Sequence, residues 1–207
     1  MSKEVTVIDI GIGNLASVLR AIKRVGGVPM LATDASSIEG ASKLIFPGVG
    51  AFGAASAALK RHGLVDSIRD AVLNRKIPIL GLCVGMQLFA QRGYENGDFP
   101  GLGLLPCEVR QLDIAKCKLL PHMGWNNLES VEGMRLFQGL PDSPDFYFVH
   151  SFHMTKLTSN VQVSHCTYGE QRITAAVQLG NIYGTQFHPE KSLANGMHVL
   201  KRFIEDA

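Results

Sequence analysis

The residues with the clearest chemical potential are residues 81–85 (Gly-Leu-Cys-Val-Gly), which follow the apolar run 77–80. Glycines two residues before and two residues after a nucleophile allow a strand to turn sharply into a helix, because side chains there would collide with neighbouring backbone. Such a turn exposes the side chain at its apex, and the positive end of the following helix favours a thiolate. The pattern predicts that Cys83 is a covalent nucleophile.

A cysteine in an apolar stretch also has a structural interpretation, since free cysteine is often buried as a small hydrophobic side chain. A packing cysteine does not need glycines at this spacing, so the glycines favour catalysis at Cys83. The other cysteines are Cys107, Cys117 and Cys166. They form no C-x-x-C and no zinc-ligand pattern, and we predict that they are packing residues.

A thiolate nucleophile needs a base, and the base needs an orienting group. Residues 188–190 (His-Pro-Glu) supply both types after a segment with strand character. In extended backbone, residues two apart face the same side, so His188 and Glu190 are expected to project together, with Pro189 restricting the backbone between them. We predict a triad of Cys83, His188 and Glu190, although the segment alone would also suit a surface turn.

Together, residues 81–87 (Gly-Leu-Cys-Val-Gly-Met-Gln) and the late His-Pro-Glu resemble the class I glutamine amidotransferases, whose triad hydrolyses the side-chain amide of glutamine and releases ammonia. Three further segments resemble the glutaminase subunit of imidazole glycerol phosphate synthase, the ammonia-supplying half of a histidine-biosynthesis enzyme. They are residues 9–15 (Asp-Ile-Gly-Ile-Gly-Asn-Leu), 47–52 (Pro-Gly-Val-Gly-Ala-Phe) and 121–126 (Pro-His-Met-Gly-Trp-Asn). The resemblance implies glutamine as substrate and a heterodimer with a (β/α)8-barrel cyclase, which makes imidazole glycerol phosphate and an aminoimidazole carboxamide ribonucleotide.

The loop of Gly48, Val49 and Gly50 follows a strand-like segment, and open α/β sheets place their sites at the carboxyl ends of strands. Its backbone N–H groups, together with the N–H of Val84, could stabilise the oxyanion that forms when Cys83 attacks an amide carbonyl. We expect an oxyanion hole here, with an ordinary glycine turn as the alternative.

Residues 147–152 resemble the family segment that lines the glutamine pocket, mainly through its backbone. The resemblance implies pocket roles for His150, Ser151 and Phe152. Gln87, one helical turn after Cys83, is a candidate polar contact to glutamine, with solvation on an amphipathic helix as the alternative. His150 and His153 have no accompanying ligand cluster, so we predict no metal site. We expect no cofactor.

The resemblance places Gly11, Asn14, Trp125 and Asn126 at the interface with the partner. A single tryptophan in an apolar domain is often a packing residue, so a core position is the alternative for Trp125. Residues 11–16 also satisfy G-x-G-x-x-G/A, so dinucleotide binding is a weak rival interpretation.

The composition is that of one α/β domain spanning residues 1–207, with 46% hydrophobic and 18% charged residues. A net charge of +2 with scattered basic residues argues against nucleic acid as a partner. The chain has no signal-peptide pattern and no apolar run of about 18 residues, so we expect a cytoplasmic protein that does not enter a membrane.

The elements that must position these residues alternate between strand and helix in the first half and are mostly strands in the second. Predicted strands cover 5–10, 29–32, 43–46, 77–80, 108–112, 146–152, 162–168, 175–179 and 182–187; predicted helices cover 15–25, 52–62, 64–74 and a segment from about 193. This order predicts a mostly parallel open sheet with helices on both faces and a strand-rich C-terminal extension.

Three alternative functions remain open from the sequence. A paralogous glutaminase could supply ammonia to a sugar-modifying amidotransferase in surface-polysaccharide synthesis, and only its partner would distinguish it. A cysteine hydrolase or peptidase would be fully active alone. A nucleotide-binding or scaffold module would bind a dinucleotide and hydrolyse no glutamine.

Overall fold

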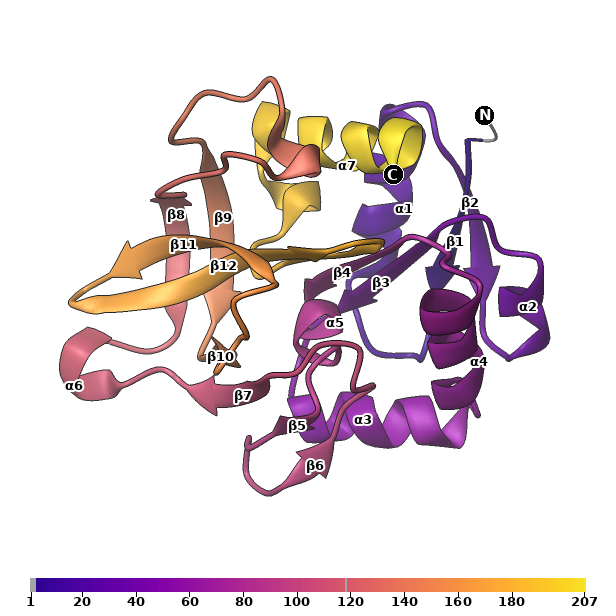
Figure 1. The fold of residues 1–207 in the computed structure, drawn as a ribbon, viewed down its shortest axis with the longest axis horizontal. Coiled ribbons are helices and arrows are strands. Elements are labelled where there is room, and N and C mark those ends of the chain that lie inside the picture. The colour runs from indigo at the N-terminus through magenta and orange to yellow at the C-terminus, as the bar shows by residue number, and fades with distance from the viewer. Residues whose placement is uncertain (1–2, 118) are drawn as a thin grey trace.

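A computed structural model describes residues 3–117 and 119–207 (Figure 1). Its centre is a seven-stranded sheet with the strand order β11-β12-β13-β4-β3-β1-β2. The strands are β1 (Glu4–Ile8), β2 (Val28–Ala32), β3 (Leu44–Gly48), β4 (Ile79–Cys83), β11 (Gln162–Tyr168), β12 (Gln171–Leu179) and β13 (Ile182–Thr185). Pairing is parallel from β2 through β1, β3 and β4 to β13, and antiparallel at β12 and β11. The predicted mostly parallel sheet with a strand-rich C-terminal part is confirmed, and the whole sheet is mixed.

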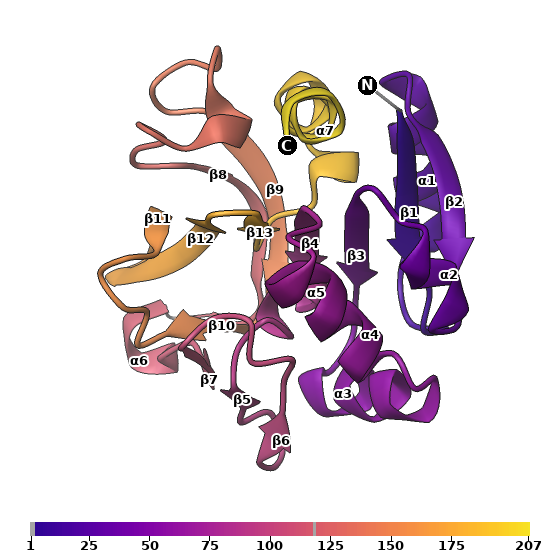
Figure 2. The same ribbon diagram turned by 45° about the vertical axis from the view of Figure 1, so that its right-hand side comes forward.

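Helices cover both faces of this sheet, as predicted, with α7 and α1 on one side and α3 and α4 on the other (Figures 1 and 2). The helices are α1 (Leu15–Arg24), α2 (Ser36–Glu39), α3 (Phe52–Arg61), α4 (Val65–Arg69), α5 (Val84–Gln87), α6 (Ile114–Cys117) and α7 (Leu193–Asp206). Side chains alternate across a strand, and in β3 Phe46 packs in the core under α3 whereas Ile45 packs in the core under α1 and α7. The alternation divides the apolar interior into two layers around the sheet.

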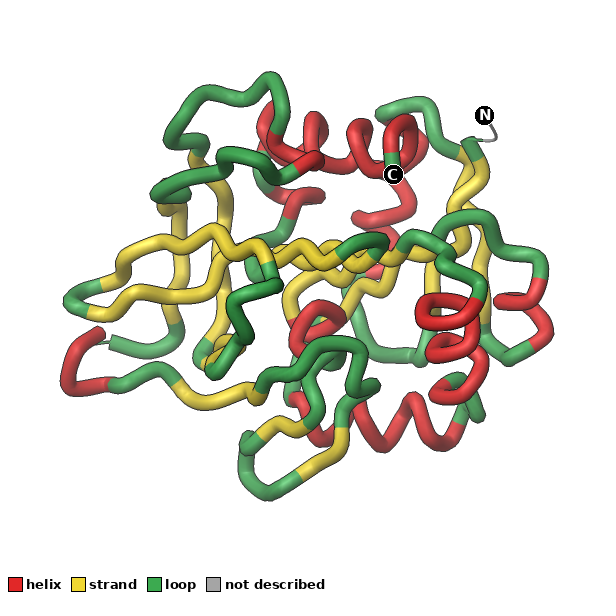
Figure 3. Tube along the Cα trace, viewed as in Figure 1, coloured by secondary structure: helices red, strands yellow, loops and turns green. Residues whose placement is uncertain are grey.

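Two smaller sheets lie beside the main one and complete the site (Figure 3). They have the orders β10-β7-β5-β6 and β8-β9. Their strands are β5 (Arg92–Gly93), β6 (Phe99–Pro100), β7 (Glu108–Gln111), β8 (His122–Asn127), β9 (Asp145–His150) and β10 (Phe152–Thr155). β8 was not predicted, because its sequence His-Met-Gly-Trp-Asn-Asn lacks the alternation of apolar and polar residues that marks a strand.

Two predicted elements are interrupted in the structure. The helix predicted over 64–74 is α4 followed by a π-helical turn, Asp70–Asn74. The strand predicted over 146–152 is broken at Ser151, so that β9 pairs with β8 and β10 pairs with β7. Periodicity cannot distinguish one strand with two partners from two short strands, because both give the same alternation.

Across the described ranges 3–117 and 119–207, no helix has both the length and the apolar character needed to cross a membrane.

Candidate active site

The turn that carries Cys83 has the geometry of a nucleophile elbow. β4 ends at Cys83 and α5 begins at the next residue, and Cys83 has φ 53° and ψ −110°, a conformation that non-glycine residues rarely adopt. A Cβ on Gly81 would lie 2.6 Å from Cα of Met86, and one on Gly85 would collide with the carbonyl oxygen of Phe46. Both glycines are therefore required, as the sequence predicts. α5 spans only four residues, so the helix dipole contributes less to a thiolate than a long helix would.

The glycine loop lies next to the elbow because β3 is a parallel neighbour of β4. Gly48, the last residue of β3, is the register partner of Cys83. Gly50 has φ +98°, in the left-handed region that favours glycine. Val49, Gly50 and Val84 line one pocket together with Cys83. Their backbone groups are thus near the sulfur, and the oxyanion hole stays a prediction.

His188 reaches the elbow from the opposite side, since β13 is the other parallel neighbour of β4. The backbone of His188 is held at both ends: its N–H donates to the Tyr147 carbonyl at 2.9 Å, and its carbonyl accepts from the Ser192 hydroxyl at 2.7 Å. Pro189–Lys191 forms a single 3-10 turn. Glu190 therefore does not lie in an extended segment, and the expected reason for its position was wrong. The turn still brings Glu190 Oε1 to 2.9 Å from His188 Nδ1.

The electrostatics of His188 are set by burial and by two neighbours, Cys83 and Glu190. Burial disfavours the imidazolium, but the hydrogen bonds and charges of Cys83 and Glu190 outweigh burial and raise the pKa of His188 to about 10. The side chains of His188 and Glu190 are 2% and 1% exposed, so water screens the pair little. The arrangement stabilises an imidazolium at His188.

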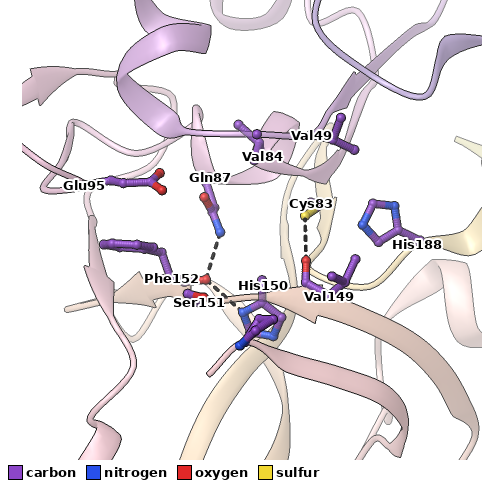
Figure 4. A pocket seen from close by; sticks show the side chains of 12 residues that line it. Val49, Cys83, Val84, Gln87, Glu95, Val149, His150, Ser151, Phe152 and His188 are labelled. Atoms are coloured by element: carbon purple, nitrogen blue, oxygen red, sulfur yellow. Dashed lines mark hydrogen bonds between the residues drawn. The ribbon is translucent and has the colours of Figure 1, made fainter. Parts of the chain in front are cut away.

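The Cys83 sulfur has two further polar neighbours. Its thiol donates to the Val149 carbonyl at 3.9 Å, and the side-chain amide of Gln186 donates to the sulfur at 3.6 Å. Within the described chain His188 Nε2 has no hydrogen-bond partner, although the His188 ring lies beside the sulfur (Figure 4). The contact with Val149 belongs to the neutral thiol, whereas the raised pKa of His188 requires Cys83 as its partner.

A cavity of about 280 Å³ opens above these residues (Figure 4). It is lined by Val49, Gly50, Cys83, Val84, Gln87, Glu95, Pro121, Val149, His150, Ser151, Phe152 and His188. This volume is at the lower end of ligand sites, which suits a single amino acid rather than a peptide. Most predicted site residues therefore share one cavity. Gly48 lies behind it in β3, and Glu190 lies behind His188.

A protein-family model described as glutamine amidotransferase class-I matches residues 6–207. The chain belongs to the class-I glutamine amidotransferase family.

Curated relatives of this amidotransferase align along nearly its whole length. Imidazole glycerol phosphate synthase subunit HisH 1 of Campylobacter jejuni (strain RM1221) is 41% identical over 97% of this chain and 98% of the relative. The HisH subunits of Moorella thermoacetica and Lactococcus lactis are 43% and 42% identical, with coverages of 98% and 95%, and of 99% and 99%, respectively.

Solved structures show the same fold at lower identity. A crystal structure of a glutamine amidotransferase superposes with a TM-score of 0.77 at 23% identity, over 97% of both chains. A chain of PurLQS from Thermotoga maritima also gives 0.77, at 19% identity over 98% of both chains.

Sequence reasoning missed two residues of the amidotransferase pocket, Glu95 and Pro121, whereas Val149 lies in the segment 147–152 that was expected to line it. The Glu95 carboxylate accepts a hydrogen bond from the Phe52 N–H at the start of α3, at 2.7 Å. Glu95 is twelve positions after Cys83, in a loop with no motif of its own, so the only available signal was an acidic residue following the elbow.

The predicted interface residues lie outside the pocket lining. Trp125 is 47% exposed and makes an edge contact with Tyr147, with ring centroids 6.2 Å apart, so it is not a core residue. Asn126 faces inward, where its amide donates to the Thr167 carbonyl at 3.0 Å. Gly11 is exposed and Asn14 half-buried, in the loop before α1. Their contact with a partner stays a prediction.

The other cysteines of the amidotransferase are free and buried. Burial raises the pKa of the Cys107 and Cys166 thiols to about 12, which suits packing residues and not nucleophiles. Within residues 3–117 and 119–207, no group of three or more His, Cys, Asp and Glu side chains could hold a metal ion.

Proposed function

We propose that this chain is the glutaminase subunit of imidazole glycerol phosphate synthase, which hydrolyses glutamine and delivers ammonia to a (β/α)8-barrel cyclase in histidine biosynthesis. The observation that carries the proposal is the elbow cysteine next to a buried His188–Glu190 pair in a cavity of amino-acid size. The full-length similarity to HisH subunits supports the pathway.

The first half of the reaction forms a thioester. The Cys83 sulfur attacks the side-chain carbonyl carbon of glutamine, and the electron pair of the carbonyl moves to its oxygen. Backbone N–H groups of the glycine loop and of Val84 stabilise that oxyanion. As the oxyanion collapses, the C–N bond breaks and His188 gives its proton to the leaving nitrogen, which departs as ammonia.

The second half releases glutamate. His188, now neutral, takes a proton from water, and the resulting hydroxide attacks the thioester carbonyl. Collapse of this second intermediate breaks the C–S bond and regenerates the Cys83 thiolate. Glu190 keeps the His188 ring oriented through the Nδ1 contact in both halves.

Substrate recognition is assigned to two polar side chains of the cavity. Glu95 presents a carboxylate to the cavity, and we infer that it pairs with the α-ammonium group of glutamine. Gln87 turns its Nε2 toward the Phe152 carbonyl at 2.8 Å, so its Oε1 is the atom left to accept from the substrate.

The test is the Cys83→Ala variant assayed in complex with the cyclase and its ribonucleotide substrate. Loss of the nucleophile should abolish glutamine-dependent synthesis, a fall of roughly 10⁴-fold or more. Synthesis from added ammonium salt should persist, because the cyclase chemistry does not need this triad. The matched control is Cys107→Ala, which removes a buried packing thiol and should retain glutamine-dependent turnover.

Glutamine-dependent turnover by the Cys83→Ala complex would contradict the nucleophile assignment. Wild-type glutaminase activity that the cyclase does not stimulate would move the assignment to the paralogous sugar pathway or to a stand-alone hydrolase.

A further inference from the structure

A second pair of buried histidines lies at the cavity, with His150 in its lining and His122 packed against His150, and the mechanism above does not use it. His122 on β8 and His150 at the end of β9 are 2% and 6% exposed, and His122 Nδ1 lies 3.0 Å from His150 Nε2. His150 Nδ1 lies 2.9 Å from the Phe152 carbonyl oxygen, which also accepts from Gln87. His122 is stacked between Phe148 and Tyr168, with centroid separations of 4.7 and 4.2 Å.

The hydrogen bonds of Asn126 fix the direction of donation at the outer end of the series that runs from Asn126 through His122 and His150 to the Phe152 carbonyl. The Asn126 amide donates through Nδ2 to the Thr167 carbonyl at 3.0 Å, while its Oδ1 accepts from the Asn127 N–H at 2.9 Å. These contacts establish which end of the amide is nitrogen. The same Nδ2 lies 3.2 Å from His122 Nε2, so His122 Nε2 must be an acceptor without a proton.

The contact of His150 with the Phe152 carbonyl independently gives the same direction of hydrogen-bond donation. The Phe152 carbonyl can only accept, so His150 Nδ1 must carry a proton. A neutral His150 then has an unprotonated Nε2, which accepts from the Nδ1–H of His122. Both rings are therefore the Nδ1–H tautomer, with one proton each.

An extra proton has no place in this arrangement. A proton on His150 Nε2 would face the Nδ1–H of His122, and a shift of the His122 proton to Nε2 would face the Asn126 amide hydrogens. The titratable groups that act on His150 are His122, His153 and His188, and none of them carries a negative charge that would favour an imidazolium. Burial accordingly lowers the pKa of His150 to about 3 and that of His122 to about 4.

The effect of the pair extends to the nucleophile through two amides. Gln87 Nε2 donates to the Phe152 carbonyl and also to Gln186 Oε1 at 3.0 Å. Because Gln186 uses Oε1 for that contact, its Nε2 is turned to the Cys83 sulfur, 3.6 Å away. The orientation of each amide depends on the one before it.

We propose that His122 and His150 are positioning residues that form a neutral hydrogen-bond relay, which orients the amides of Gln87 and Gln186 and directs an N–H donor to the sulfur of Cys83. Only one consequence of the relay rests on the proposed function, namely its effect on the rate of glutamine hydrolysis. Its protonation state and its effect on sulfur reactivity are independent of the substrate.

The first measurement is ¹⁵N NMR of histidine-labelled protein, which distinguishes protonated from unprotonated ring nitrogens. Wild-type His122 and His150 should both carry the proton on Nδ1 and should not titrate between about pH 5 and 8. Signals are assigned by their loss in His122→Phe and His150→Asn. A ring of either residue that is protonated on Nε2, or that titrates in this range, overturns the relay.

The second measurement is the alkylation rate of Cys83 by iodoacetamide at neutral pH, with kcat/KM for glutamine in the cyclase complex beside it. His122→Phe keeps the aromatic stack but frees His150 from its Nδ1–H tautomer, so both rates should fall roughly tenfold, the size of one lost hydrogen bond to a charged group.

The decisive comparison is the double variant His122→Phe/His150→Asn. The asparagine amide restores an N–H donor to the Phe152 carbonyl without any need for His122, so it should recover most of the alkylation rate. A role confined to packing would make the double variant worse than the single one. The matched control, His153→Gln, removes another buried histidine outside the relay and should leave alkylation unchanged; thermal unfolding of every variant verifies its fold.

The outcomes separate the relay from the proposed function. Unchanged alkylation in His122→Phe, or a double variant slower than the single one, overturns the relay even if the complex hydrolyses glutamine. The expected alkylation and NMR results support the relay even if the wild-type complex hydrolyses none.

Discussion

The cavity has histidines in two of its walls that are both buried, and one is an imidazolium whereas the other is neutral. His188 is 2% exposed and has a pKa raised to about 10, whereas His150 is 6% exposed and has a pKa lowered to about 3. The difference lies in the neighbours: His188 lies beside Cys83 and meets the Glu190 carboxylate, whereas His150 meets a carbonyl and another neutral ring. Burial by itself lowers the pKa of both, so it is the anionic partner that makes one a proton donor and leaves the other a fixed neutral link.

The largest expected effect comes from removing the Glu190 carboxylate from the catalytic wall, the part of the cavity formed by Cys83, His188 and Glu190. In Glu190→Gln, kcat should fall by about 10²- to 10⁴-fold, because the His188 ring loses its orienting partner. The pKa of His188 should also fall below about 10, because one of the two groups that raise it loses its charge, so the alkaline limb of the pH profile for glutamine hydrolysis moves to lower pH. The control Glu205→Gln, at a half-buried carboxylate on α7 that pairs with Lys201, should keep the wild-type profile. An alkaline limb that does not move would contradict the claim that the Glu190 carboxylate raises the pKa of His188.

A smaller effect should follow from adding a carboxylate to the neutral wall, the part of the cavity formed by His150 with His122 packed against it. His122→Glu places a carboxylate beside His150, and its charge should raise the pKa of His150 from about 3 by roughly 1–3 units. The NMR titration of the His150 ring nitrogens measures this shift. The neutral variant His122→Gln serves as the control, since it adds no charge. If His150 has the same pKa in the His122→Glu variant as in this control, a carboxylate partner does not determine the charge of a buried histidine in this cavity.

The smallest effect concerns stability. The pKa of His188 is about 10 in the folded chain and about 6.5 when unfolded, so the folded state holds this proton more tightly. The resulting stabilisation is complete below about pH 6.5 and is lost as the pH rises to about 10. Denaturant unfolding across this window should show a steeper loss of unfolding free energy in the wild type than in His188→Gln. A control outside the cavity, the half-buried His198→Gln, should follow the wild type, and equal slopes for wild type and His188→Gln would refute the linkage.

The catalytic wall could be predicted from sequence because its signals are local. Cys83 is flanked by glycines whose missing side chains the elbow requires, and His188 and Glu190 are two residues apart. Even there the reason was partly wrong, since a 3-10 turn and not extended backbone brings the acid to the ring. Short-range spacing constrains which residues meet more strongly than it constrains the backbone that joins them.

The neutral wall could not be predicted because it depends on pairing between distant segments. His122 meets His150 only where β8 pairs with β9, in register as direct partners, and β8 carries no strand pattern. Asn126 was assigned to the partner interface by resemblance, and its inward amide became visible only with the strand in place. Glu95 enters the cavity from a loop without a motif.

The position of Trp125 has an optical consequence. It is the sole tryptophan of the chain, half-exposed and in edge contact with Tyr147, whose carbonyl oxygen accepts the backbone hydrogen bond of His188. Intrinsic fluorescence excited selectively at tryptophan therefore originates at one surface, a short covalent and hydrogen-bonded distance from the catalytic base. A change in the surroundings of Trp125 can therefore be followed in real time without attaching a dye.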